Sequence, residues 1–327
     1  MRNKTLMKLV LFAFLIGAGL IGYSQKNISP MAVLEQPKII QENYKYMQVY
    51  FCETDDCGKI QADLIKNTEN PDCAFYDIDL ENMVSELSKK NYRLVTNDHS
   101  KISLEHKFDT NKALMHDKFC IYSNNTFSSG SFNPKEASLF KDYNNLIVIQ
   151  SDYLSQNYRD EFEELFSGIF GSGAKVRYPK VQYGDILIEN YFCPEDSCQK
   201  HVLEQMDKAN SSIYGLLFSF TDSYIAEKLV EKKNLDIKLV VEKQRMNMQY
   251  EKYKFLKENG INIKTDSNPY LLHDKVWIID RKIVITGSYN PTASGNTKND
   301  ENILIIHSSE LAEKLLKRFD SIYSSAN

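Results

Sequence analysis

Two stretches of the sequence place a histidine and a lysine two positions apart: His116 with Lys118, and His273 with Lys275. Residues i and i+2 of a β-strand point to the same face, so each stretch presents an imidazole beside an ammonium group. An ammonium group neutralises a phosphate, and an imidazole can attack phosphorus or transfer a proton. Cleaving a phosphodiester takes a nucleophile on one side of phosphorus and an acid on the other, and two facing copies would supply both.

A Gly-Ser-x-Asn stretch follows each histidine at the same spacing. Glycine lets the backbone come close to a ligand, and the serine and asparagine side chains offer hydrogen-bonding groups to phosphate oxygens. We therefore expect four side chains to bind the substrate phosphate: Ser131, Asn133, Ser288 and Asn290.

The elements that carry these groups occur twice. Each half begins with an apolar run ending in Tyr-Phe-Cys-x4-Cys, and continues with helix, strand, helix and strand before the His-x-Lys stretch. A further strand and a closing helix, predicted over 153–166 and 309–323, complete each half. This order predicts an α/β fold of two lobes related by a pseudo-twofold axis, each a mixed, mainly parallel sheet flanked by helices.

The lobe boundaries follow from the repeat and from the composition between its copies. We place the first lobe at 45–168, a linker rich in glycine and proline at 169–184, and the second lobe at 185–327. A pseudo-twofold axis would let a motif present once per lobe meet its twin at the interface.

The second copy resembles the H-x-K-x4-D-x6-G-S-x-N signature of the phospholipase D superfamily, and an acidic residue follows at the family's downstream position. The resemblance covers both halves. It implies a bilobal α/β fold, a covalent phosphohistidine intermediate, and neither a metal nor a cofactor. It also implies these catalytic residues: His116, Lys118, His273, Lys275, Asp280 and Glu301.

The first copy is degenerate. Ser123 stands where the signature has aspartate, and Asn144 stands at the place of Glu301. The aspartate position lies five residues beyond the lysine, and ~3.3 Å per residue puts it too far along the strand to touch the same phosphate. That position is expected to tie the turn, so Ser123 should be tolerated.

The acidic position predicts which histidine is the nucleophile. A carboxylate that accepts the Nδ1 proton stabilises an imidazolium or a phosphohistidine, whereas an amide supplies no charge. If Glu301 serves its own half, His273 is the nucleophile and His116 the acid. Many members of the superfamily instead use the N-terminal histidine as the nucleophile.

The N-terminal segment has the pattern of an export signal. A short basic stretch precedes an uncharged apolar run from Leu9 to Ser24. We expect 1–24 to be a signal peptide or an N-terminal membrane anchor, which predicts a secreted or periplasmic protein, or one anchored to the outer face of the cytoplasmic membrane.

Six cysteines would then enter an oxidising compartment. The pairs Cys52–Cys57 and Cys193–Cys198 suit short loop disulfides, and we favour this over a zinc site built from the same four thiolates. Cys73 and Cys120 fit a third disulfide or two buried thiols.

Three functions are compatible with these patterns. The first is phosphodiester hydrolysis on phospholipid head groups at a membrane surface, since a net charge of −4 disfavours a broadly basic nucleic-acid binder. The second is a secreted or surface nuclease with a locally basic groove, and the third is a non-catalytic phosphate-binding module. The aromatic-rich segment at 246–256 fits a core stripe or a surface for lipid or base stacking. No obligate protein partner is evident.

Overall fold

The computed structural model describes residues 38–98, 102–110 and 113–327, and the fold below lies within 39–327. The predicted signal peptide or anchor at 1–24 lies outside the described residues. Among the residues that are described, no helix is both long and apolar enough to cross a membrane.

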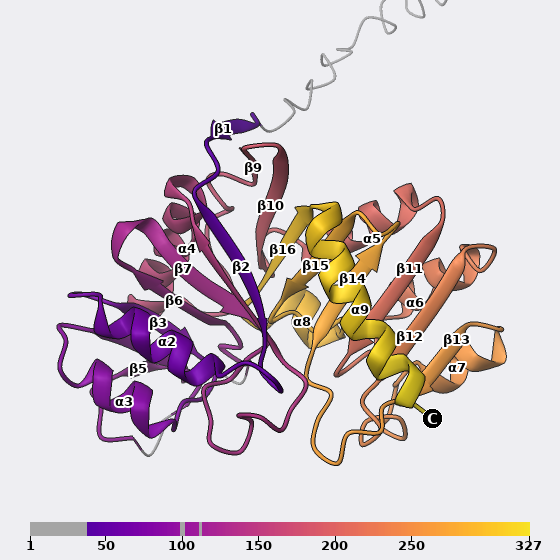
Figure 1. Ribbon diagram of the computed structural model, residues 1–327, viewed down its shortest axis with the longest axis horizontal. Coiled ribbons are helices and arrows are strands. Elements are labelled where there is room, and N and C mark those ends of the chain that lie inside the picture. The colour runs from indigo at the N-terminus through magenta and orange to yellow at the C-terminus, as the bar shows by residue number, and fades with distance from the viewer. Residues whose placement is uncertain (1–37, 99–101, 111–112) are drawn as a thin grey trace, which may run out of the picture. The chain divides into compact units, whose positions relative to one another are not determined.

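The first half forms a sheet with seven strands in its described part (Figure 1). In spatial order the strands are β2 (Tyr46–Phe51), β8 (Asn145–Gln150), β7 (Thr126–Gly130), β6 (Lys118–Tyr122), β3 (Asp72–Phe75), β4 (Arg93–Thr96) and β5 (Lys107–Phe108). The first His-x-Lys stretch leads into β6, at the centre of this sheet.

The second half forms a sheet of nine described strands. In spatial order they are β1 (Ile40–Glu42), β9 (Lys180–Tyr183), β10 (Ile186–Cys193), β16 (Glu301–His307), β15 (Ile283–Gly287), β14 (Lys275–Ile279), β11 (Ser212–Leu217), β12 (Asp236–Val241) and β13 (Asn262–Thr265). The second His-x-Lys stretch leads into β14. Strand β9 lies inside the predicted linker, and β1 joins it from ahead of the first lobe.

The two mixed α/β sheets confirm the predicted fold class, but "mainly parallel" is wrong. The pairs that run parallel are β3–β4, β4–β5, β11–β12, β12–β13 and β1–β9. The remaining described neighbours run antiparallel. The reason is the length of the connections. Helices α3 (Glu81–Leu87) and α6 (Ser223–Glu231) form crossovers between parallel strands, whereas short turns join β6 to β7 and β14 to β15.

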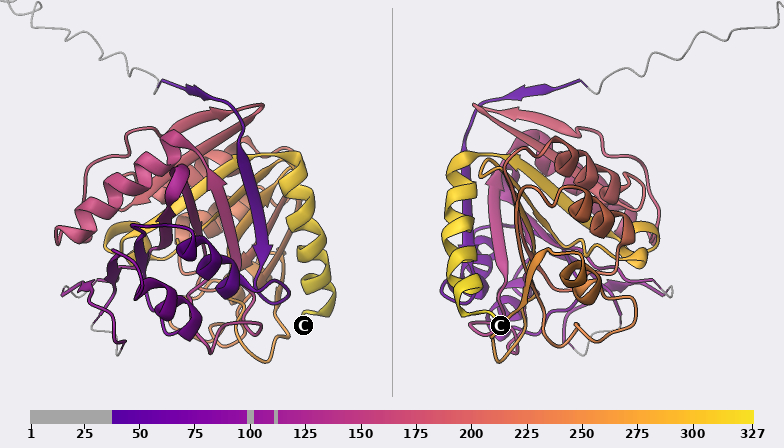
Figure 2. Two further views of the ribbon diagram at one scale, coloured as in Figure 1. Left: turned by 60° about the vertical axis from the view of Figure 1, so that its left-hand side comes forward. Right: turned by 90° about the vertical axis from the view of Figure 1, so that its right-hand side faces the viewer.

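Helices cover the outer face of each sheet (Figures 1 and 2). In the first half these are α2 (Cys57–Lys66) and α3, and in the second they are α5 (Cys198–Lys208) and α6. The shorter helices are η1 (Ser123–Asn125), α7 (Tyr253–Glu258) and α8 (Ala293–Thr297). Each outer cluster of buried side chains stays within its own half, so it stabilises that half alone.

The closing helices α4 (Asp152–Phe166) and α9 (Ser309–Ser325) begin at equivalent places. Ser151 and Ser308 are their N-caps, and the two serine hydroxyls accept from the backbone N–H groups of Leu154 and Leu311. Both helices appear close to the predicted ranges because serine caps and helical periodicity are local signals.

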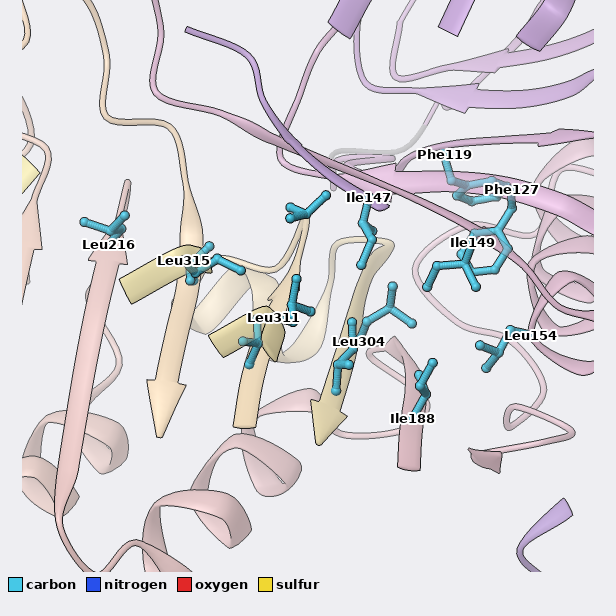
Figure 3. Close-up of a cluster of buried hydrophobic side chains, with 14 of the residues drawn as sticks. Phe119, Phe127, Ile147, Ile149, Leu154, Ile188, Leu216, Leu304, Leu311 and Leu315 are labelled. Carbon is cyan, nitrogen blue, oxygen red and sulfur yellow. The ribbon is translucent and has the colours of Figure 1, made fainter. Parts of the chain in front are cut away.

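One continuous core joins the two halves. Figure 3 shows Phe119 and Phe127 of the first sheet in the same cluster as Leu216 and Leu304 of the second. Side chains of α4 and α9 complete it, Leu311 among them. Each such buried side chain contributes roughly 1.5–3 kcal/mol, so this core holds the two His-x-Lys strands in a fixed relation.

All six cysteines are paired in disulfides, which excludes the zinc alternative for the four loop thiols. The predicted loop disulfides Cys52–Cys57 and Cys193–Cys198 are confirmed. Cys73 and Cys120 are the third pair, since they lie directly opposite each other on β3 and β6.

Candidate active site

His116 and His273 line a single cavity of about 450 Å³, as the two-copy interpretation predicts. Both residues are buried, each with 7% of its surface exposed. Asn133 and Asn290 line the same cavity. The duplicated motif therefore forms one site with two imidazoles.

Backbone contacts between the halves create this arrangement. Just before each His-x-Lys strand, one residue forms a parallel bridge with the other half: Met115 with Asp300, and Leu272 with Tyr143. The His116 N–H donates to the Asp300 carbonyl at 2.9 Å, and the His273 N–H donates to the Tyr143 carbonyl at 2.9 Å. Glu301 follows Asp300 in the chain, so it lies beside His116. Asn144 follows Tyr143, so it lies beside His273.

The orienting groups are consequently exchanged between the halves. Nδ1 of His116 lies 2.7 Å from Oε2 of Glu301, which comes from the second half. Nδ1 of His273 lies 2.9 Å from Oδ1 of Asn144 and 3.1 Å from the Ser131 carbonyl, both from the first half. The premise that Glu301 serves its own half is wrong, because the bridge next to His116 brings in the strand of the opposite half.

Both imidazoles are neutral in the resting site. Burial is the main cause that holds the pKa of His116 and of His273 well below the usual value, and the neighbouring ammonium groups of Lys118 and Lys275 lower both further. In each ring Nδ1 meets an acceptor, so Nδ1 carries the proton and Nε2 is left for a ligand.

The two lysines are equivalent in position and contacts. Nζ of Lys118 donates to the His116 carbonyl at 2.6 Å, and Nζ of Lys275 donates to the His273 carbonyl at 2.5 Å. Each ammonium also lies over an aromatic ring, 5.2 Å from the centroid of Tyr76 for Lys118 and 4.9 Å from that of Phe218 for Lys275. Each ammonium keeps further N–H groups for a phosphate.

The serines of the Gly-Ser-x-Asn stretches have hydrogen-bond partners inside the protein. The Ser131 hydroxyl donates to Oδ1 of Asn144 at 2.9 Å and accepts from the Asn145 N–H. The Ser288 hydroxyl accepts from the Asn302 N–H at 3.0 Å and hydrogen-bonds Glu301. Both serines are fully buried. They hold the groups that orient the histidines, and phosphate binding by these serines stays a prediction.

The asparagines of these stretches fit the prediction better. Asn133 and Asn290 line the cavity, and their Oδ1 atoms have no hydrogen-bond partner within the described residues. An amide oxygen and a phosphate oxygen are both acceptors, so these side chains would bind a phosphate through their Nδ2 donors.

Asp280 lies at the far end of β14 from His273, at the turn into β15, where the sequence predicts that this position ties the turn. Its carboxylate accepts from the backbone N–H groups of Asn210, Ser211 and Ser212, and from the Ser211 hydroxyl. It therefore ties the β14–β15 turn to the start of β11. These donors hold the pKa of Asp280 below its usual value, although partial burial opposes them.

We expect Asp280→Asn to lower the free energy of unfolding by roughly 1–2 kcal/mol and to leave kcat unchanged, because it weakens hydrogen bonds to a charge far from the reacting atoms. Thermal melts and hydrolysis of a chromogenic phosphodiester measure the two effects. A variant with an unchanged melting temperature and a large loss of kcat would keep Asp280 in the catalytic set.

The sequence analysis missed the aspartate between each histidine and lysine. Asp117 accepts a hydrogen bond from Nδ2 of Asn302 at 2.5 Å, and Asp274 accepts one from Nδ2 of Asn145 at 2.7 Å. Each bond crosses between the halves. The repeated His-Asp-Lys triplet was the available signal, although period-2 placement puts the aspartate on the opposite face of the strand from the histidine.

Arg245 is a second missed residue. It follows β12, lines the cavity, and lies over the Phe218 ring at 4.3 Å from the centroid. Burial lowers its pKa from the usual value, although Glu242 opposes this effect. The guanidinium adds a cation near the two lysines. Because it has no counterpart inside the motif, spacing could not reveal it.

Two groups of opposite sign give the site a narrow pH window. Burial raises the pKa of Glu301 to about 7, and burial lowers the pKa of Lys118 to about 7. Below pH 7 the carboxylate that faces His116 becomes protonated, and above pH 7 the Lys118 ammonium loses its charge. We expect kcat/KM to follow a narrow bell centred near pH 7.

A pH series of kcat/KM for wild type and Glu301→Gln tests this assignment. In the variant the acid limb should disappear while the alkaline limb remains. An acid limb that persists without the carboxylate would contradict the assignment of this limb to Glu301.

The fold and the site together define a two-lobed α/β phosphodiesterase whose lobes share one two-histidine cavity. The protein family described as cardiolipin synthase, PLD-like domain, matches residues 59–166 and 202–323, more than half of the chain. The chain therefore belongs to the phospholipase D superfamily.

Three relatives show the extent of the similarity. Phospholipase D of Rickettsia prowazekii (strain Madrid E) is 30% identical over 159 residues, covering 48% of this chain and 78% of the relative. The human mitochondrial cardiolipin hydrolase is 27% identical over 134 residues, covering 40% of this chain and 53% of that protein. The crystal structure of phosphatidylserine synthase from Haemophilus influenzae Rd KW20 matches with a TM-score of 0.63 over 86% of each chain; its 10% identity makes this a likeness of fold.

Proposed function

We propose that this chain hydrolyses phosphodiesters of phospholipid head groups through a covalent phosphohistidine on His116, with His273 as the general acid and base. The observation that carries this proposal is the unequal pair of orienting groups. His116 faces the Glu301 carboxylate, whereas His273 faces only the neutral amide of Asn144 and a backbone carbonyl. The carboxylate can stabilise the positive charge of an N-phosphorylated imidazole, and the amide cannot.

In the first step Nε2 of His116 attacks phosphorus, and the bond from phosphorus to the leaving-group oxygen breaks. The bound phosphate anion raises the proton affinity of the nearby His273 imidazole, so His273 carries a proton on Nε2. His273 gives this proton to the leaving oxygen. Lys118 and Lys275 neutralise the developing charge, and the amides of Asn133 and Asn290 contact the phosphate oxygens.

In the second step His273 takes a proton from a water molecule, which attacks phosphorus as the bond to Nε2 of His116 breaks. The products are a phosphomonoester and a free alcohol, and both imidazoles return to their starting state. The hydrogen bond to Glu301 holds the proton on Nδ1 of His116 throughout, so Nε2 remains the nucleophilic atom.

The rim of the cavity supports a lipid substrate. Met248 lines the cavity and has half of its surface exposed, and Tyr250 two residues later is 72% exposed. Tyr270 is also exposed, next to the lining residue Leu271. The segment at 246–256 is therefore largely surface, contrary to the core-stripe alternative. Aromatic and methionine side chains at a cavity mouth suit the head-group level of a membrane.

A substrate panel tests the reaction and the substrate class separately. Hydrolysis of bis(p-nitrophenyl) phosphate, abolished in His116→Ala, establishes the reaction. Vesicles of phosphatidylglycerol and phosphatidylethanolamine, compared with single-stranded DNA, then establish the substrate. Release of head groups from vesicles is the expected result. Cleavage of DNA alone would replace the lipid assignment with a nuclease, and a lack of turnover on every substrate would leave only phosphate binding.

Arg245 should favour substrates that carry a second anionic group besides the phosphodiester. We expect Arg245→Gln to raise KM about 10-fold or more for a phosphodiester that carries a second anionic group, because a partly buried guanidinium lies in the cavity. KM for bis(p-nitrophenyl) phosphate, which has no such group, should change much less. Lys254→Gln is a matched control, since it removes an exposed cation from the neighbouring helix α7. Equal effects on both substrates would contradict this role.

A further inference from the structure

The two halves differ in one buried feature beyond the active site. In the second half, Arg318 on α9 reaches the aspartate of the His-Asp-Lys triplet, with Nη1 2.7 Å from Oδ2 of Asp274. Its Nε also pairs with Glu53. A cation therefore compensates these two acidic groups, as buried charges require.

The equivalent place in the first half holds a glutamate. Glu161 and Arg318 are each the tenth residue after the serine that caps their helix, Ser151 or Ser308. Asp117 is the counterpart of Asp274. Its Oδ1 accepts from Asn302, but its Oδ2 has no hydrogen-bond partner within the described residues, and its side chain is fully buried. Glu161 therefore stands in the first half at the helix position that Arg318 has in the second, and both Asp117 and Glu161 are buried.

Two further carboxylates complete the cluster: Glu164 on α4, and Glu195 in the loop closed by the Cys193–Cys198 disulfide. Oxygens of Glu161, Glu164 and Glu195 all lie within 4.8 Å of one another. The Ala174 N–H donates to the Glu164 carboxylate at 3.0 Å, and a side chain at Gly173 would collide with that carboxylate. Within 38–98, 102–110 and 113–327, none of the three glutamates forms an ion pair.

Within the described residues, these acidic groups of the first half lack a cation of this kind. Glu161 and Asp117 are both buried, whereas in the second half the guanidinium of Arg318 pairs with Asp274 and Glu53.

We propose that Glu161, Glu164 and Glu195 bind one Ca²⁺ ion, which takes the place that the guanidinium of Arg318 has in the other half. The ligands are all oxygens, which suits a hard cation. Mg²⁺ demands a near-ideal octahedron and keeps several waters, whereas Ca²⁺ accepts flexible geometry and several carboxylates at once, so a site built from three glutamates favours calcium. The ion would join α4 to the disulfide loop, and this role is independent of the reaction.

The test uses the full-length chain, freed of metal with EDTA and titrated with CaCl2 by calorimetry at pH 7.5. We expect one Ca²⁺ per chain, and a melting temperature that rises by about 4 °C at saturating calcium. Glu164→Gln and Glu195→Gln should each weaken binding by about 10-fold or more, because each removes a charged ligand. Glu310→Gln, an exposed glutamate of α9, is the matched control and should bind like wild type.

A second variant introduces into the first half the arginine that the second half has at the equivalent helix position. Glu161→Arg should take up no calcium, and should melt at a higher temperature than calcium-free wild type, because the guanidinium can pair with Asp117. The proposal is overturned if wild type takes up no calcium, if uptake survives in both ligand variants, or if MgCl2 produces the same response. Should Glu161→Arg fail to fold, the ligand variants still decide.

Discussion

His116→Ala is expected to lose at least ~10⁴-fold in kcat, and to form no covalent intermediate with a ³²P-labelled phosphodiester. The reason is the position of Glu301. Its carboxylate lies 2.7 Å from Nδ1 of His116, so only this imidazole has a negative partner that can balance the charge of a phosphohistidine. Rapid quenching in alkali, where the P–N bond of phosphohistidine is stable, followed by peptide mapping of the label at alkaline pH, measures the intermediate directly.

His273→Ala is the matched variant, since it removes the second imidazole of the same cavity. With a p-nitrophenyl leaving group, which needs no acid, this variant should still form the labelled intermediate on His116. It should then accumulate label, because water has lost its general base. Label that is lost in His273→Ala and retained in His116→Ala would reverse the two roles.

Glu301→Gln is expected to lower kcat by ~10³-fold, with a much smaller change in KM. Glutamine can still accept a hydrogen bond from Nδ1–H and orient the ring, but it cannot balance the charge that develops on His116. The variant therefore separates charge from orientation. Steady-state kinetics at pH 7, with a thermal melt to confirm folding, measures the effect.

A double variant gives a sharper control, because the orienting groups occupy equivalent places in the two halves. Glu301→Gln combined with Asn144→Glu moves the carboxylate from His116 to His273. We expect part of the label to move to the peptide that contains His273. Label that stays entirely on His116 would show that the carboxylate does not select the nucleophile.

The sequence was enough to predict the superfamily, the α/β class and the meeting of His116 and His273. These follow from local signals, namely period-2 placement of His and Lys on a strand, the duplicated motif, and the alternation of strands with helices. The two loop disulfides were also predicted, because short Cys-x4-Cys loops restrict the partners, whereas the pairing of Cys73 with Cys120 stayed open beside two buried thiols. The first lobe's Asn144 was correctly singled out as the weaker orienting position, although its partner was not.

Only the tertiary structure decided which histidine each orienting group serves. Glu301 is 28 residues from His273 and 185 residues from His116 along the chain, yet it contacts His116. The contact depends on the Met115–Asp300 bridge between the halves, and sequence spacing carries no information about such a bridge. The same holds for Arg245, the cross-half bonds of Asp117 and Asp274, and the inward orientation of Ser131 and Ser288. Spacing identifies which groups a chain carries, while long-range packing decides which of them touch.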